Sequence, residues 1–304
     1  MALIRISFEE DSTNSTTGNG QFLLTNEGID CGSYTIDPPP HDYNYFLSQL
    51  HSVNQYFENV SYGKFGIDLA QSSIYPSSLN GSYQLVNTMD FYNPYDDPLG
   101  QEEKLTKLFK DAIEQSYSED AIEFSKYDLV VIFHAGIGQD FSLPFLDPTP
   151  EDIPSTYIDE DMIQEHLGQS HINVGNHTIQ KGIILPETQN HLLYDISETM
   201  FSDAENPCEY QYGITGTFSL MIGFAIGLPP LWNIQTGESG VGVFGLMDQG
   251  SNNGRGIIPA PPTAWSRIYA GWENVVIGEL GSEYHIPKRS ENSIIIMWRG
   301  INCI

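Results

Sequence analysis

The sequence predicts an α+β fold in which a mixed, twisted sheet packs against helices and one helix is buried between layers. Two further patterns support this prediction. Residues 128–133 form a nearly continuous apolar run, as in a central buried strand, and they follow an amphipathic helical pattern at residues 102–117. Residues 214–232 are apolar on nearly every side of a helical wheel, so that helix has no face suited to water.

The amino-terminal part of the chain has the patterns of a strand, a loop and a helix. Residues 2–8 alternate apolar and polar side chains as a half-buried strand does, and a polar loop follows at residues 9–20. Three consecutive prolines then introduce a helix over residues 42–60, whose apolar positions recur at helical spacing. A second strand is expected at residues 65–69.

The region before the buried helix is harder to assign. Residues 140–176 are polar and contain acidic residues among prolines, so we predict a long irregular excursion that is functional or mobile. A short apolar strand is expected at residues 181–186 and a polar loop at residues 187–198. The buried helix should end at Gly227, because glycine permits a left-handed turn and the following prolines prevent continuation.

The sequence of the carboxy-terminal part predicts a helix within residues 261–272, which begins after two prolines, and two strands at residues 275–280 and 293–298. We therefore assign residues 1–272 to one main domain. Residues 273–304 either complete it or begin a following sheet.

Composition limits the function classes. The chain has 304 residues and a net charge of -28, from 40 acidic and 12 basic side chains. Such a field repels nucleic acids and anionic membranes, so we expect neither as a partner. The glycines, hydroxyls and paired prolines of residues 214–232 leave too little continuous apolar helix to span a bilayer.

The cysteines and the overall composition suit an exported protein. Cys31, Cys208 and Cys303 allow at most one disulfide and leave one thiol over. Lysine is scarce and tyrosine and asparagine are abundant, yet no signal peptide precedes the first strand. We therefore expect a piece of a longer secreted or cell-surface protein.

The end of the buried helix carries a family resemblance. The run Gly-Leu-Pro-Pro-Leu-Trp at residues 227–232 resembles the end of the active-site helix in immune-inhibitor-A-like secreted metallopeptidases. The prolines, helix and Val-Ser-Tyr-Gly-Lys segment of residues 38–64 are similar to the same family, as are residues 240–250 and 261–272. The resemblance covers most of the chain and implies a zincin-like architecture.

The active-site helix of that family begins with His-Glu-x-x-His, in which two histidines one helical turn apart bind zinc and the glutamate activates a water molecule. Here Leu220, Met221 and Phe224 occupy those positions, and the family often has an acidic residue where this chain has Pro230. Leucine and phenylalanine have no atom that binds a metal, and methionine neither accepts nor relays a proton. The resemblance therefore implies a domain that has lost zinc and hydrolysis. We expect the three side chains to be largely buried and to close the floor of the former metal site with apolar contacts.

Three further residues are candidates for binding. His134 follows the apolar strand, and Asp140 begins the next loop. Met247 lies in a turn that resembles the methionine turn beneath the metal in these peptidases. For His134 we favour a buried histidine that fixes a turn, and for Met247 plain packing under the helix.

A calcium site is a second possibility, since the oxygen-rich region contains Asp147, Asp152 and Asp159. The Asp-x-Asp-x-Asp-Gly pattern of a calcium loop is missing, so ordinary solvation is the preferred interpretation.

Our leading hypothesis is a peptidase-like domain that is catalytically inactive and binds a peptide or protein in the former cleft. One alternative is a working zinc peptidase whose ligands come from five histidines without a recognisable zinc spacing, namely His134, His166, His171, His177 and His191. A second alternative is a structural domain of a surface protein. Metal content distinguishes the leading hypothesis from the first alternative, because only a working peptidase would bind zinc.

Overall fold

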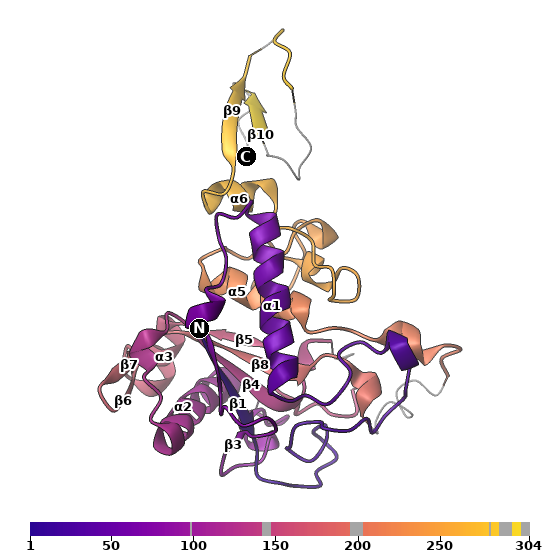
Figure 1. Ribbon diagram of the computed structural model, residues 1–304, viewed down its shortest axis with the longest axis vertical. Coiled ribbons are helices and arrows are strands. Elements are labelled where there is room, and N and C mark those ends of the chain that lie inside the picture. The colour runs from indigo at the N-terminus through magenta and orange to yellow at the C-terminus, as the bar shows by residue number, and fades with distance from the viewer. Residues whose placement is uncertain (98, 142–146, 195–202, 280, 286–293, 299–304) are drawn as a thin grey trace.

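A six-stranded sheet forms the centre of the computed structural model, which describes residues 1–97, 99–141, 147–194, 203–279, 281–285 and 294–298 (Figure 1). The strand order is β2-β1-β4-β8-β5, and β3 also pairs with β1. The pairings are parallel except that the edge strand β5 runs antiparallel to β8. The strands are β1 (Ala2–Ser7), β2 (Ser73–Tyr75), β3 (Tyr83–Gln84), β4 (Val130–Ile137), β5 (Thr156–Ile158) and β8 (Gly182–Thr188).

Helices cover both faces of this sheet. One core contains α2 (Gln101–Asp120), α3 (Glu160–Leu167) and the hairpin of β6 (Ile172–Val174) and β7 (His177–Ile179), and it includes Val130 and Ile132 of β4. The core on the other face contains α1 (Tyr43–Val60) and α5 (Thr215–Ala225), and it includes Val131 and Phe133. Neighbouring side chains of a strand point to opposite faces, so β4 is buried on both. The predicted α+β class with a mixed sheet and packed helices is confirmed.

The expectation of a half-buried first strand is wrong, because every residue of β1 is buried. Helices on both faces leave β1 no solvent side, as is usual for parallel sheets. Its one charged side chain, Arg5, is 1% exposed. The guanidinium donates hydrogen bonds to the carbonyl oxygens of Pro76, Ser78 and Leu79 at 2.5, 2.6 and 2.9 Å. These bonds compensate for its removal from water.

The expected ends of α1 and α5 are confirmed. Asp42 caps α1, since its carboxylate accepts hydrogen bonds from the backbone N–H groups of Asn44 and Tyr45. At the other helix, Gly227 has φ 87°, in the left-handed region that favours glycine. The N–H of Leu228 then donates to the carbonyl of Gly223 at 2.9 Å, which closes the last turn of α5.

The predicted irregular excursion at residues 140–176 is wrong, because this region contains β5, α3 and β6. Their strands have three residues each and are too short to display a period. The strand expected at residues 65–69 is also wrong, since β2 begins at Ser73. The polar loop predicted at residues 187–198 instead starts with the last two buried residues of β8, and residues 195–198 lie outside the described residues.

Two strands follow α6 (Ala264–Tyr269) near the end of the chain, namely β9 (Asn274–Gly278) and β10 (Ile294–Trp298). They pair in parallel as a separate two-stranded sheet, which projects beyond α6 and away from the main sheet (Figure 1). This agrees with the small carboxy-terminal sheet that the sequence predicts. Short 3-10 helices occupy Gly32–Tyr34, Leu69–Gln71, Asp90–Tyr92, Phe124–Lys126, Gln139–Phe141, His191–Leu193, Pro207–Tyr210, Gly242–Phe244 and Gln249–Asn252.

Cys31 and Cys208 form a disulfide that joins the excursion before α1 to the segment before α5. Cys303 lies outside the described residues. Across the described part of the chain, every helix is too short or too polar to cross a membrane.

Candidate functional site

Helix α5 has two different sides. Phe218 and Ile222 lie on its inward side and pack in the core against the sheet, where they are 0% and 1% exposed. The ring of Phe218 meets Phe133 of β4 edge-on, with centroids 5.3 Å apart. The opposite side carries Thr217, Leu220 and Met221 and borders a cavity.

The cavity has a volume of about 270 Å³ and combines an apolar floor with a polar wall. Leu220, Met221 and Trp232 supply the floor, and the wall comes mainly from the region of the 3-10 helix Gln249–Asn252. Drug-sized ligands occupy cavities of about 300–1,000 Å³, so this one fits a single side chain or a similarly small group. The remaining lining residues are Asp140, Thr217, Gly237 and Asp248.

The expectation that Leu220, Met221 and Phe224 are largely buried is confirmed, since none of the three is more than partly exposed. Met221 is buried at 7% exposure, whereas Leu220 and Phe224 keep part of their surface open to solvent. The ring of Phe224 stacks on Tyr157 of the edge strand β5 at 6.3 Å and meets the edge of Trp232 at 5.7 Å. These positions therefore present apolar surface beside a cavity instead of sealing it.

Met247 packs directly beneath α5. It is fully buried, and a Cβ atom added to Gly223 would lie 2.5 Å from its sulfur. The helix approaches the methionine this closely because residue 223 has no side chain. The carbonyl of Met247 also accepts a hydrogen bond from the N–H of Leu231 at 2.8 Å, which anchors the chain after α5.

Asp248 organises the polar wall of the cavity. One carboxylate oxygen accepts hydrogen bonds from the hydroxyl of Ser239 and from the N–H groups of Gly240, Val241 and Gly242, at 2.7–2.9 Å. Burial alone raises the pKa of Asp248, but these hydrogen bonds outweigh it and lower the pKa. Asp248 was not among the residues predicted from the sequence, although an acid after a glycine-rich turn is a signal for such a set of N–H donors.

Asp140 lies on the rim of the same cavity, as a candidate binding residue should. Its carboxylate accepts hydrogen bonds from the N–H of Ser155 at 3.0 Å and the hydroxyl of Ser155 at 2.8 Å, and from the side-chain amide of Gln189. These bonds connect the rim to the residues just after β8 and just before β5.

The structure places His134 inside the sheet and not in the cavity. It is 0% exposed, and its Nδ1 lies 2.8 Å from the carbonyl oxygen of Ala135. Burial lowers the pKa of His134 to about 4. The turn expected at residues 134–138 is largely strand, because β4 continues to Ile137. This histidine is therefore neutral and part of the core.

The three candidate calcium ligands have separate local roles. Asp147 accepts a hydrogen bond from the N–H of Thr149 at 2.9 Å, and Asp159 caps α3. Asp152 accepts two bonds from Thr17, at 2.7 and 2.5 Å, and burial raises its pKa to about 7.

The five histidines of the alternative hypothesis are likewise spread over β4, α3, the β6–β7 region and a 3-10 helix. Within the described ranges, three or more His, Cys, Asp or Glu side chains are nowhere grouped as a metal site would require.

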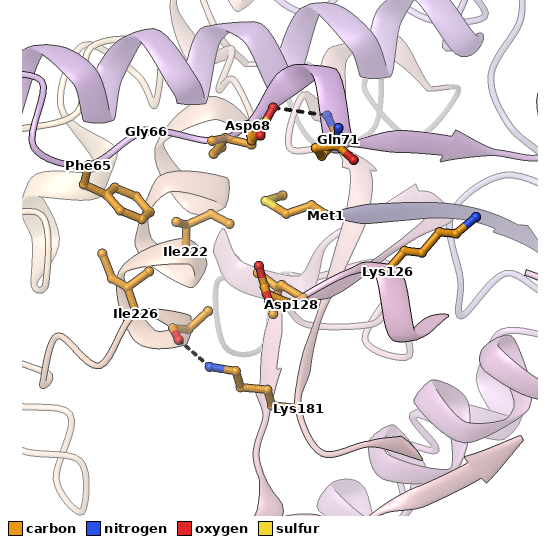
Figure 2. Close-up of a pocket in the computed structure, with 13 residues that line it drawn as sticks. Met1, Phe65, Gly66, Asp68, Gln71, Lys126, Asp128, Lys181, Ile222 and Ile226 are labelled. Atoms are coloured by element: carbon orange, nitrogen blue, oxygen red, sulfur yellow. Dashed lines mark hydrogen bonds between the residues drawn. The ribbon is translucent and has the colours of Figure 1, made fainter. Parts of the chain in front are cut away.

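A second cavity of about 370 Å³ borders another side of α5 (Figure 2). Ile222, Ala225 and Ile226 form part of its wall, and Lys181 at its rim donates a hydrogen bond to the carbonyl of Ala225 at 2.9 Å. It lies near the amino-terminal ends of β1, β4 and β8. The residues that line it differ from those around Leu220 and Met221.

Comparisons with known proteins identified no relative of this chain. No protein-family model matches the chain, and no curated protein or solved structure is detectably similar to it.

Proposed function

We propose that the chain is a catalytically inactive, metallopeptidase-like domain of the immune inhibitor A type, which binds an apolar side chain of a peptide or protein in the cavity beside α5. One observation carries the proposal. Leu220 and Met221 occupy the positions at which the metallopeptidase motif has a zinc ligand and the catalytic glutamate. Both residues line the cavity floor.

Three features support the zincin-like part of the proposal. The helix in question is buried against a mixed sheet and ends at the glycine that the resemblance indicates. Met247 packs beneath that helix, where the resemblance expects the methionine turn. The edge strand β5 contacts the same helix, because the ring of Tyr157 stacks on that of Phe224.

The chemistry of the site favours binding over hydrolysis. A catalytic zinc site needs three protein ligands and a polarised water molecule. The α5 face offers a leucine, a methionine and a phenylalanine, and the carboxylates of Asp140 and Asp248 are occupied by hydrogen bonds from the protein itself. An apolar floor instead gains free energy when it removes an apolar side chain from water.

The cavity also indicates the kind of ligand. A volume of about 270 Å³ matches one aliphatic or aromatic side chain, and the polar groups of Gln249, Ser251 and Asn252 can accompany the main chain that carries it. The charge of -28 disfavours acidic partners. We therefore propose neutral or basic peptide segments with one apolar anchor residue.

The disulfide between Cys31 and Cys208 supports an oxidising compartment, because such bonds persist mainly in secreted and surface proteins. We accordingly propose a secreted or cell-surface location.

Selection from a random peptide library displayed on phage tests the binding proposal. We expect enriched peptides to share one apolar residue, and we expect Leu220→Trp to weaken their binding at least about tenfold, which is about 1.4 kcal/mol. The larger ring fills the cavity, and position 220 is partly exposed and tolerates the change. The matched control is Leu79→Trp, since Leu79 is 52% exposed and lies outside the cavity.

Equal binding by wild type and Leu220→Trp would place the peptide site elsewhere. Cleavage of the selected peptides by the wild-type protein would contradict the loss of catalysis.

A further inference from the structure

Glu187, at the end of β8, is a fully buried carboxylate that joins four segments of the chain. One oxygen lies 2.6 Å from Nδ1 of His41 and accepts a hydrogen bond from the N–H of Leu23 at 2.9 Å. The other accepts hydrogen bonds from the N–H of Gly136 at 2.7 Å and the hydroxyl of Tyr194 at 2.6 Å. The sequence alone predicts a polar loop at this residue.

Two of these partners close the base of a loop, which we call the 23–41 loop. The N–H of His41 donates to the carbonyl of Leu23 at 2.8 Å, so the two ends of the loop meet at Glu187. Farther out, Cys31 is joined to Cys208 by the disulfide. The carboxylate of Asp37 accepts a hydrogen bond from the N–H of Ile214 at 2.9 Å, at the start of α5.

The surroundings of His41 require its protonated form. Its Nδ1 faces the carboxylate of Glu187, and its Nε2 lies 2.9 Å from the carbonyl oxygen of Asp37. A neutral imidazole has one N–H group, whereas the imidazolium has two and satisfies both acceptors. Burial alone lowers the pKa of His41, but the hydrogen bond and charge of Glu187, together with Asp37, raise the pKa above its usual value.

Other ionisable groups also surround the pair, among them Asp152, whose charge acts on Tyr194 and whose pKa burial raises to about 7. Burial raises the pKa of Asp37, and it raises the pKa values of Tyr45 and Tyr194 well above their usual range, so both phenols stay neutral. The ring of Tyr45 on α1 stacks on His41 at 4.3 Å. His134 on β4 is neutral because burial lowers its pKa to about 4.

We propose that the proton on His41 latches the 23–41 loop, and that losing this proton opens the base of the loop while the sheet stays folded. Without the second N–H, either the buried carboxylate of Glu187 loses one of its four donors or the partly buried carbonyl of Asp37 loses the donor on His41, and either loss is costly. The disulfide keeps the outer part of the loop attached near α5, so the opening is local and reversible. This is a proton-dependent conformational device, separate from peptide binding.

The sign of the pH dependence follows from the raised pKa of His41. The latch is complete below about pH 6.5, the usual value for a histidine, and it is lost as the pH rises through the higher folded value. Between the usual pKa of a histidine and the raised pKa of His41 in the closed loop, each opening event releases one proton from His41. The equilibrium constant for opening therefore rises about tenfold per pH unit, and it levels off above the folded pKa.

Hydrogen-exchange mass spectrometry from about pH 6 to about pH 10, corrected for the intrinsic exchange rate, tests this inference. We expect peptides covering Leu23 and His41 to lose protection with that tenfold slope, while β4 peptides keep theirs. In His41→Gln the same peptides should be unprotected at every pH, because glutamine does not titrate. The matched control is His177→Gln, a buried histidine of β7 outside the latch, which should reproduce the wild-type profile.

The wild-type profile decides the question even if His41→Gln does not fold. Protection of the 23–41 loop that is constant across the pH range would overturn the latch. So would a pH-dependent loss that persists unchanged in His41→Gln.

Discussion

Replacing Cys31 and Cys208 with serine is expected to lower the free energy of unfolding by about 4–5 kcal/mol. The two cysteines are 177 residues apart, so their disulfide excludes many extended conformations of the unfolded chain. This loss is a large share of the roughly 5–15 kcal/mol that stabilises a typical domain. Urea unfolding of the oxidised protein and the double variant measures it, with Cys303→Ser in both backgrounds to prevent disulfide exchange.

The folded structure should survive this change, because side chains also join the two segments. Gln211 accepts a hydrogen bond from the N–H of Ile36 at 2.7 Å and donates one to the carbonyl of Tyr34 at 3.3 Å. Reduced wild type should match the double variant. A loss below about 1 kcal/mol would show that the unfolded chain gains little freedom when the disulfide is removed.

The triple substitution Leu220→His, Met221→Glu and Phe224→His is expected to restore no peptidase activity and to cost about 2–5 kcal/mol of stability. Most of the cost comes from Met221, since a carboxylate there enters a site that is 7% exposed. Leu220 and Phe224 contribute less, because both are partly exposed. Ligand identity alone is insufficient, since a zinc site also needs a third ligand and groups that orient the imidazoles.

Casein hydrolysis with added zinc, measured beside a thermal melt, checks both parts of this prediction. The matched control is Leu79→His, at a position 52% exposed and away from α5, which should melt like the wild type. Strong cleavage that a chelator abolishes would mean that only the ligands had been lost and that the rest of the site had remained.

The sequence was most informative about long elements with a clear period. The expected helices at residues 42–60 and 102–117 correspond to α1 and α2, and residues 130–133 of the apolar run form the first part of β4. In each of these, side-chain spacing along the chain itself determines which face is buried. The stop at Gly227 was equally local and was predicted for the same reason.

The missed features depend on residues that are distant in sequence. The edge strand β5 has three residues and is defined by its partner β8, so it has no period of its own. Glu187 appeared to belong to a polar loop because its partners, Leu23 and His41, lie more than a hundred residues away. A buried charge is recognisable only when its compensating partners are known.

The cavity was missed for a similar reason. The apolar identities of Leu220 and Met221 predicted that both are largely buried, but they could not predict a cavity beside them, because Trp232 and Asp248, in the chain after α5, hold its opposite side. Hydrophobicity predicts which residues avoid water, but it does not specify where packing leaves a space.

The metal content of the purified protein tests the loss of the zinc site most directly. The protein would be produced in zinc-containing medium, purified without chelators and analysed by inductively coupled plasma mass spectrometry against its concentration. We predict far less than one zinc ion per chain, because the α5 face presents Leu220, Met221 and Phe224 in place of metal-binding side chains. One stoichiometric zinc ion per chain, removable by a chelator, would contradict this account.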